Sequence, residues 1–265
     1  MVADLARRGG GAGVKGPELR AEAIVLGVVD YGDSDRVVTL LTRERGKVPA
    51  FAAGARKSKR RFAGALEPFT RLDVRLSEGK GELYFLSSCE VLAAHAGLRE
   101  DLARIGHAGY AGELCRELCR EREPHPELYD LLAGYLAGLC ARDSRSEDLL
   151  AFELGALRHA GFSPRFSDCA MCGAEVAGGA IFDPSHGGVL CPTCAPYAQH
   201  GCVRADAPAL AASRTLQASD PFTAFDLPDA RALGQARALV RTFSRHVLGK
   251  RLRALDFLAQ IGVEA

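Results

Sequence analysis

Residues 169–172 read Cys-Ala-Met-Cys, and a second pair, Cys-Pro-Thr-Cys at residues 191–194, follows after eighteen residues. Two CxxC pairs at this separation are typical of a structural zinc site, in which four thiolates surround one ion as a tetrahedron. Gly173 after the first pair and Pro192 inside the second favour a tight turn at each pair. The sequence therefore predicts one structural Zn²⁺ with these four ligands: Cys169, Cys172, Cys191 and Cys194.

Other roles for the paired cysteines fit less well. Two disulfides would need an oxidising compartment, and no export signal is visible. Redox-active pairs usually occur singly and near a βαβ pattern. His186 and His200 could each replace a cysteine, but four thiols already fill the tetrahedron and leave no open position for a catalytic zinc. Between the pairs, residues 180–182 and 188–190 are expected to form a hairpin.

The composition describes an ordinary globular protein. The 265 residues are enough for about two domains, and the net charge of +1 implies no particular partner. Nine cysteines without a secretory signal favour a reducing, cytoplasmic location. No stretch approaches the ~20 apolar residues that a membrane span needs. The Arg- and Gly-rich residues 1–17 are expected to be a disordered leader, and we expect no membrane association.

The first third of the chain is rich in short strands. The strands are expected at residues 22–29, 36–42, 47–54, 69–77 and 82–91. In the fourth, Leu72, Val74 and Leu76 alternate with polar residues, which indicates one buried face. Five strands in so short a length can hide their edges by closing into a barrel, and the oligonucleotide-binding (OB) fold is the common five-stranded solution. We therefore predict an OB-fold domain over residues 18–95.

The remainder of the chain has helical periodicity. Helical segments are expected at residues 97–105, 113–122, 128–139, 146–159, 208–216 and 230–258. Ser146 is expected to cap the helix that begins there, and Gly161 to end it. The predicted fold class is α+β, with a helical domain over residues 96–265 and a zinc-binding module inserted at 165–203.

Positive charge collects in two places. Between residues 43 and 61 there are eight basic residues and one acid. The candidates for phosphate contact in this stretch are Arg43, Lys47, Arg56, Lys57, Lys59, Arg60 and Arg61. Such a cationic loop beside an OB groove suits a nucleic-acid backbone. Candidate rings for stacking on bases are Tyr31, Phe51, Phe62 and Phe69. The alternatives are a solvated turn and core aromatic residues.

The second cluster lies between residues 231 and 253, which hold seven basic residues and no acid. Arg237, Arg241 and Arg245 are spaced by four, so they share one helical stripe. This stripe could hold phosphates or the acidic tail of a protein, or it could be a solvated helix face. Candidate contacts to DNA or to such a tail are Arg237, Arg241, Arg245, Lys250 and Arg251.

No set of residues indicates catalysis. The chain lacks a Walker GxxxxGK[ST] motif and an HxE pattern beside its cysteines. Cys115, Cys119 and the single cysteines, Cys202 among them, are expected to be buried free thiols. The sequence therefore favours a binding protein over an enzyme.

Several segments stand in one order along the chain. They are residues 22–26 (EAIVL), 30–36 (DYGDSDR), 40–42 (LLT), 46–47 (GK), 54–58 (GARKS), 61–69 (RFAGALEPF), 152–154 (FEL), 241–243 (RTF) and 246–252 (HVLGKRL). Together with the paired cysteines, they resemble the zinc-containing branch of the bacterial RecO family over roughly residues 18–260.

This resemblance implies a DNA repair and recombination mediator that catalyses no covalent chemistry. Such proteins bind single- and double-stranded DNA, anneal complementary strands and, with RecR, help load RecA onto DNA coated by single-stranded DNA-binding protein (SSB). They also bind the acidic, Phe-ending C-terminal tail of SSB. The resemblance adds Arg36 to the residues expected to hold phosphates, and it implies a nucleoid-associated, cytoplasmic protein.

Two other classes stay open at this point. An RNA-binding or ribosome-associated protein could combine an OB fold with a zinc ribbon, and competition between DNA and RNA of one sequence would separate it from a DNA-binding protein. A zinc-dependent enzyme such as a deaminase would need the HxE pattern that is missing.

Overall fold

The computed structural model describes residues 17–58, 61–62, 64–79, 83–143, 145–227 and 229–263. The chain packs as two units. One combines the chain up to Asp101 with Cys115–Ala141, and the other combines Leu102–Leu114 with the chain from Arg142 onward. The domain limits expected from the sequence, 18–95, 96–265 and 165–203, stay a prediction. The expected leader lies outside the described residues except for Pro17.

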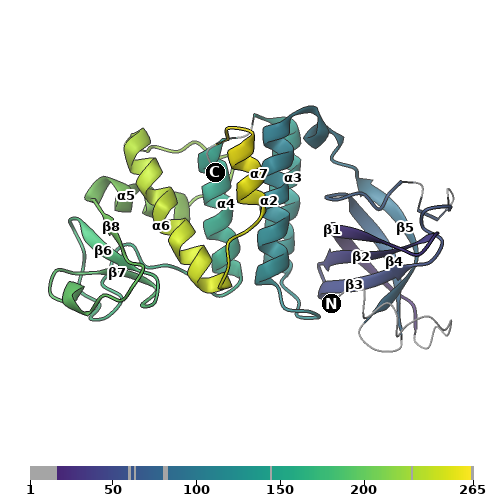
Figure 1. Ribbon diagram of the computed structural model, residues 1–265, viewed down its shortest axis with the longest axis horizontal. Helices are drawn as coiled ribbons and strands as arrows, with labels where there is room; N and C mark the ends of the chain where they lie inside the picture. The colour runs from purple at the N-terminus through teal and green to yellow at the C-terminus, as the bar shows by residue number, and fades with distance from the viewer. Residues whose placement is uncertain are drawn as a thin grey trace. The chain divides into compact units, whose positions relative to one another are not determined.

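The first unit contains a closed five-stranded barrel (Figure 1). Its strands are β1 Leu19–Tyr31, β2 Asp35–Thr42, β3 Gly46–Ala52, β4 Arg71–Glu78 and β5 Tyr84–Ala93. The strand order is β1-β2-β3-β5-β4, and β1 pairs with both β2 and β4 to close the sheet. β3 and β5 form the parallel pair, with Phe51 opposite Phe85. This is the predicted OB fold, with each strand within a few residues of its expected place.

The barrel is filled by the alternating apolar residues that the sequence indicates. Leu72, Val74 and Leu76 of β4 are fully buried. They join residues of the other strands in one apolar cluster, which Phe62 and Leu66 from the β3–β4 connection also enter. Because each fully buried side chain of this kind stabilises the fold by about 1.5–3 kcal/mol, the barrel has a substantial core of its own.

The short helix η1 Ala96–Glu100 and the helix α3 Pro126–Ala141 complete this unit. Arg71 donates to Glu22 at 2.6 Å and to the hydroxyl of Tyr129 at 3.3 Å, which ties β4 and β1 to α3. Gly46 has a φ of +65°, and a Cβ at this position would collide with the backbone of Glu123. The barrel and the segment before α3 therefore approach each other closely.

The second unit is helical. Its helices are α4 Ser146–His159, α5 Ala207–Gln217, α6 Ala230–Leu248, α7 Ala254–Gln260 and the first part of α2 Leu102–Leu118. Every residue from Asp148 to Leu157 of α4 is buried, and α4 packs against both α5 and α6. Among the helices that the structure describes, none is long and apolar enough to cross a membrane.

The ribbon that carries the four cysteines is inserted between α4 and α5. Its sheet has the order β7-β6-β8, with β6 Ala180–Asp183, β7 Gly188–Leu190 and β8 Val203–Ala205, and the short helix η2 Ala195–Tyr197 lies between β7 and β8. The expected β6–β7 hairpin is confirmed. The three-residue strand β8 was not expected, because so short a run carries no periodicity.

The helix ends differ in part from expectation. Gly161, with a φ of +86°, ends α4 as expected: its N–H donates to Arg158, and the next N–H, of Phe162, donates to Leu157. The prediction that Ser146 caps α4 is wrong, because Arg145 occupies the N-cap without a side-chain cap bond. The helical run expected over 230–258 is broken at Gly249, which has a φ of +66°.

Candidate metal centre and nucleic-acid interface

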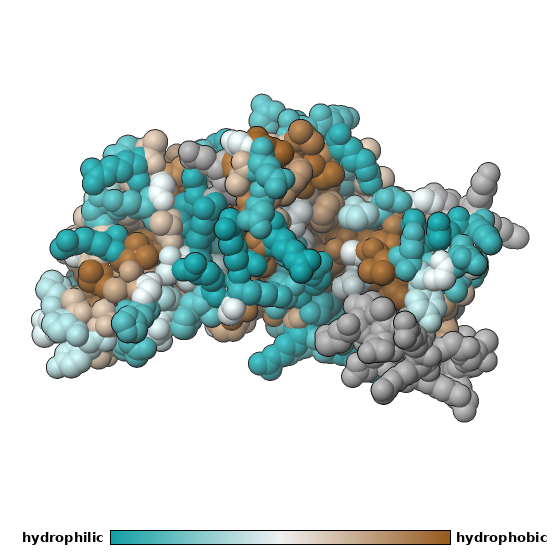
Figure 2. Space-filling model, in the orientation of Figure 1, coloured by the Kyte–Doolittle hydropathy of each residue, from teal (hydrophilic) through white to brown (hydrophobic). Residues whose placement is uncertain are grey.

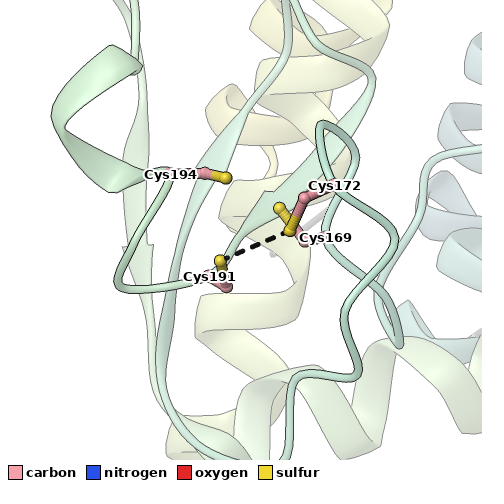
Figure 3. A group of neighbouring side chains, drawn as sticks. All are labelled: Cys169, Cys172, Cys191 and Cys194. Carbon is pink, nitrogen blue, oxygen red and sulfur yellow. Dashed lines mark hydrogen bonds between the residues drawn. The ribbon is translucent and has the colours of Figure 1, made fainter.

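The four predicted ligands meet in one place. Cys169 and Cys172 lie on the turn between α4 and β6, and Cys191 and Cys194 lie on the turn after β7 (Figure 3). The four sulfurs all lie within 4.8 Å of one another. The Sγ atoms of Cys172 and Cys191 are 3.7 Å apart. A tetrahedral site with Zn–S bonds of about 2.3 Å places its sulfurs about 3.8 Å apart, so this arrangement fits four thiolates around one ion.

The backbone at each pair is a tight turn. The N–H of Gly173 donates to the carbonyl of Cys169 at 2.9 Å, and Gly173 has the positive φ, +75°, that glycine adopts readily. At the second pair, the N–H groups of Cys194 and Ala195 both donate to the carbonyl of Cys191, at 3.0 and 2.8 Å. The short spacers therefore place the two sulfurs of each pair on the same side of a turn.

The thiols of the cluster are strongly perturbed. Burial by itself would raise the pKa of Cys169, but N–H groups of Cys172, Cys191 and Met171 hold this pKa at about 6. Burial and the other three sulfurs raise the pKa of Cys194 to about 12. The N–H of Cys194 also lowers the pKa of Cys191. Part of the cluster thus favours thiolate, whereas four thiolates repel one another unless a cation lies among them. A divalent ion bound among the four sulfurs would offset this repulsion.

The histidines do not join the sulfurs. His186 Nδ1 lies 2.9 Å from Asp183, and the buried carboxylate of Asp183 also accepts the N–H groups of Ser185 at 2.8 Å and Gln199 at 2.7 Å. Asp183 therefore fastens the β6–β7 turn to the segment after η2. In the part of the chain that the structure describes, the four cysteines form the only cluster of at least three metal-type ligands.

Two of the predicted phosphate contacts, Arg36 and Arg56, lie together at one end of the barrel. The β3–β4 loop folds back onto the β1–β2 turn: the N–H of Arg56 donates to the carbonyl of Ser34 at 2.9 Å, and its guanidinium lies 3.7 Å from Asp30. Arg36 also pairs with Asp30, at 3.1 Å, and with Glu67, at 3.8 Å. Acids of the turn therefore already offset part of this positive charge.

The rest of this group is mixed. Lys57 is exposed, whereas Arg61 donates to the carbonyl of Ala53 at 2.7 Å and lies 5.1 Å above the ring of Phe62. Lys59 and Arg60 lie outside the described residues. The cationic end of the barrel that the structure places together thus consists of Arg36, Arg56, Lys57 and Arg61.

Arg43 and Lys47 lie at the other end of β2 and β3. In the β2–β3 register Arg36 faces Ala52, whereas Thr42 faces Gly46 at the opposite end. Arg43 makes two hydrogen bonds with Asp130 of α3, at 3.0 and 2.9 Å. The Lys47 ammonium is half-buried and donates to the carbonyl of Arg116 at 2.7 Å. Both side chains therefore have a structural task within this unit, and their contact with phosphates stays a prediction.

The candidate stacking rings divide in the same way. Phe62 is buried in the barrel core, as the alternative interpretation expects. Phe69 has a φ of +69° and accepts His95 Nδ1 at its carbonyl, 2.7 Å away. Tyr31 and Phe51 lie on the outer surface, partly exposed, with ring centroids 5.8 Å apart. Phe69 is partly exposed as well, so three of the four candidate rings remain available to a ligand and Phe62 does not.

The predicted basic residues of the C-terminal part do come together. They line two neighbouring cavities, of about 330 and 410 Å³, which share Arg241, Arg251 and Leu255. The five predicted residues in their walls are Arg237, Arg241, Arg245, Lys250 and Arg251. Apolar side chains such as Leu252 and Leu258 complete the walls. Figure 2 shows hydrophilic side chains gathered over the α6–α7 region.

A buried carboxylate lies behind this basic surface. Glu153 of α4 accepts a very short hydrogen bond from the hydroxyl of Ser244 and another from Tyr110. Burial raises the pKa of Glu153. Burial also lowers the pKa of the half-buried Arg241 nearby. The sequence analysis did not identify Glu153 as a buried acid. The only sign of it in the sequence is that a charged residue stands in the apolar stripe of a helix.

Comparisons with known proteins agree with this architecture. Residues 17–95 match the family described as "Recombination protein O N terminal" and residues 99–256 match "Recombination protein O C terminal". The chain belongs to the RecO family. The C-terminal match spans the cysteine ribbon as well as the helices, so the ribbon lies within the RecO region of the chain.

Similar RecO proteins align with 68–92% of the chain. The DNA repair protein RecO of Myxococcus xanthus is 49% identical over 245 residues, which are 92% of this chain and 98% of that protein. The DNA repair protein RecO of Anaeromyxobacter sp. (strain Fw109-5) is 51% identical over 92% of this chain and 96% of its own length. That of Geobacter sulfurreducens is 43% identical over 68% of this chain and 74% of its own length.

Proposed function

We propose that this chain acts in DNA repair and recombination as a mediator that makes and breaks no covalent bond. It binds single- and double-stranded DNA, anneals complementary strands and, with RecR, helps load RecA onto SSB-coated single strands. The observation that carries the proposal is a closed OB barrel with a cationic end, in a chain of the RecO family. The location that follows is the cytoplasm, at the nucleoid.

Annealing would be an electrostatic effect. Two strands repel each other through their phosphates, and each cation that replaces condensed counterions lowers this repulsion. Lys57 is exposed, and the guanidinium groups of Arg36 and Arg56 share the carboxylate of Asp30. A phosphate that displaces this carboxylate would gain two arginines at once. Such contacts ignore base sequence, which suits a protein that must act on any single strand.

The cavities beside α6 suit the SSB tail. An acidic peptide that ends in Phe needs cations for its carboxylates and an apolar pocket for its ring. The larger cavity offers Arg237, Arg241 and Arg251 beside Leu258 and Val263. We propose that Arg241, Lys250 and Arg251 hold the acids of the tail, since Arg241 of α6 and the two residues from the segment after α6 line the same cavity.

The cofactor would be a single structural Zn²⁺ held by Cys169, Cys172, Cys191 and Cys194. A shell of four thiolates leaves no open position, so the ion stabilises the ribbon and takes no part in a reaction. Its removal should mainly unfold the ribbon.

Salt dependence tests DNA binding directly. The logarithm of the affinity for a labelled single strand should fall linearly with the logarithm of salt concentration. A variant with Lys57, Lys59, Arg60 and Arg61 replaced by Ala should have a shallower slope, because fewer phosphates are contacted. Arg120→Ala is the control, because Arg120 is an exposed arginine of the same unit and is not among the predicted phosphate contacts. An unchanged slope in the fourfold variant would reject the role of the loop.

The pocket for the SSB tail has its own test. Arg241→Ala should weaken binding of a labelled acidic, Phe-ending peptide at least tenfold, measured by fluorescence anisotropy, and leave oligonucleotide affinity nearly unchanged. The control peptide lacks the terminal Phe. If the wild-type protein and Arg241→Ala bound the Phe-ending peptide equally well, the assignment would be contradicted.

A further inference from the structure

The strand register places four apolar side chains in one row across the outside of the barrel. Val29 of β1 faces Val37 of β2, Val37 faces Phe51 of β3, and Phe51 faces Phe85 of β5. The residues next to them along the strands, such as Val38 and Tyr84, point into the barrel core. Because side chains alternate along a strand, the row itself lies on the outer surface.

Aromatic rings dominate this row. The ring of Phe51 is edge-on to Tyr31, with centroids 5.8 Å apart, and edge-on to Phe85, with centroids 6.0 Å apart. Val37 is buried beneath the rings, whereas Val29 is 51% exposed. We call Val29, Tyr31, Phe51 and Phe85 the aromatic strip. An apolar surface of this kind that stays partly exposed usually marks a binding site.

Cations stand at one end of the aromatic strip. Tyr31 leads into the β1–β2 turn, and the carbonyls of Gly32 and Ser34 in that turn accept hydrogen bonds from Arg56 at 3.4 and 2.9 Å. Lys57 follows directly and is exposed. On the face shown in Figure 2, apolar and hydrophilic side chains of the barrel lie next to each other. A ligand that fits must therefore combine flat apolar faces with negative charge.

The sheet itself narrows the choice of ligand. β2 is paired with β1 on one side and with β3 on the other over its length. An extended peptide therefore cannot add to the sheet at the centre of the strip through backbone hydrogen bonds, which is how sheets commonly capture peptides. Unpaired bases bind by another route, because every base has a face that stacks on aromatic rings. Duplex DNA keeps these faces inside its own stack.

We propose that the aromatic strip is a platform on which unpaired bases stack, so that this protein distinguishes single strands from duplex through Tyr31, Phe51 and Phe85. The cations at the end of the barrel contact phosphates of both forms and provide the affinity that the forms share. The proposal rests on the proposed DNA-binding function and adds the element that selects single strands.

A fluorescent reporter tests stacking directly. The chain contains no Trp, so the variant Phe51→Trp carries a single indole within the strip. Titration with an oligo(dT) single strand should quench its fluorescence, and titration with a blunt duplex of equal phosphate content should leave it nearly unchanged. Equal quenching by both forms, or quenching by neither while both bind, would overturn the proposal.

Affinities give a second measurement. Phe51→Leu and Phe85→Leu should each weaken binding of the single strand by about 5- to 150-fold, which corresponds to the contribution of one stacked base, and change duplex affinity less than twofold. Phe257→Leu is the matched control, because Phe257 is also exposed, at 40%, and belongs to the other unit. Unfolding curves of all variants show whether the barrel is intact.

The outcomes separate this proposal from the one on which it rests. Equal losses for single strand and duplex, or no loss for either, would overturn the role of the strip while salt-dependent binding by the wild-type protein upholds DNA binding. Failure of the wild-type protein to bind any oligonucleotide in dilute buffer would overturn both.

Discussion

The barrel and the cysteine ribbon are two small β structures that are stabilised in different ways. Of the residues that the structure describes in the barrel, sixteen are buried together in one apolar cluster. The ribbon has strands of four, three and three residues, too short to enclose a core of their own. Structures of this size usually depend on a metal or on disulfides. The proposed ion among the four sulfurs would thus do in the ribbon what the apolar cluster does in the barrel.

The ribbon is nevertheless connected to the helices around it. Phe182 of β6 stacks on Phe166 at 5.7 Å and meets Phe243 of α6 edge-on at 6.1 Å. These rings form an apolar contact between the sheet of the ribbon and the helical part of the same unit. Loss of the ribbon should therefore also loosen α6, whereas the barrel has no such dependence on the sulfurs.

The largest effect is expected from removal of one ligand. Cys172→Ser should abolish binding of the proposed zinc ion and unfold the ribbon, because metal binding supplies on the order of 10 kcal/mol to structural zinc modules. Metal analysis and hydrogen exchange of residues 165–203 measure the two effects. Cys202→Ser is the matched control, because Cys202 lies outside the cluster. Cys202 is exposed, so the expectation that it is a buried thiol is wrong. A zinc content that stays at one per chain in Cys172→Ser would show that the ligands are wrong.

A cavity in the core of the barrel should destabilise the barrel and leave the ribbon intact. Leu40 is fully buried in the barrel cluster, so Leu40→Ala should cost about 2–5 kcal/mol of the free energy of barrel unfolding. Urea unfolding followed by hydrogen exchange measures this loss of barrel stability. The ribbon of the variant should keep any bound metal. Leu92→Ala, at a side chain that is 47% exposed, should change stability by less than about 0.5 kcal/mol. Metal release in parallel with barrel unfolding would contradict the independence of the two structures.

A smaller effect is expected at the carboxylate that fastens the ribbon hairpin. Burial alone would raise the pKa of Asp183, but the N–H groups of Gln199 and Ser185 and the His186 ring hold it below its ordinary value. The stabilisation by Asp183 should be complete above about pH 4 and fall away as the pH drops through the lowered pKa. Asp183→Asn should cost about 1–3 kcal/mol at neutral pH.

Thermal unfolding as a function of pH checks this prediction. The difference in Tm between the wild-type protein and Asp183→Asn should shrink as the pH falls below about 4. Asp168→Asn, at an exposed carboxylate of the same ribbon, should have little effect at any pH. A Tm difference that grows on acidification would reverse the assigned sign.

The smallest effect concerns the acid that holds two arginines of the barrel. Asp30→Asn should release Arg36 and Arg56 for phosphates and raise DNA affinity about two- to fivefold at low salt, in line with the 0.2–1 kcal/mol of an exposed ion pair. Fluorescence anisotropy measures it. Asp33→Asn makes the same change in net charge, so an equal gain in both variants would mean that total charge alone is responsible.

The meeting of the four cysteines could be predicted from the sequence, because they stand in two short local motifs. The barrel could be predicted as well, since alternation along each strand reports which face is buried. The sequence could not predict which basic side chains form ion pairs within the protein. Arg43 pairs with Asp130, which lies eighty-seven residues further along the chain, and no local pattern indicates a partner at that distance. The prediction that Ser146 caps α4 failed for a related reason: the Ser146 hydroxyl accepts a hydrogen bond from the guanidinium of Arg237 in α6.

The most direct test of this account is a map of amide hydrogen exchange with and without a single-stranded oligonucleotide at low salt. We predict protection of the β1–β2 turn, the β3–β4 loop and the ends of β3 and β5 next to Phe51 and Phe85, with the ribbon at residues 165–203 unchanged. Protection confined to the ribbon, with the barrel unaffected, would contradict the assignment of DNA binding to the barrel.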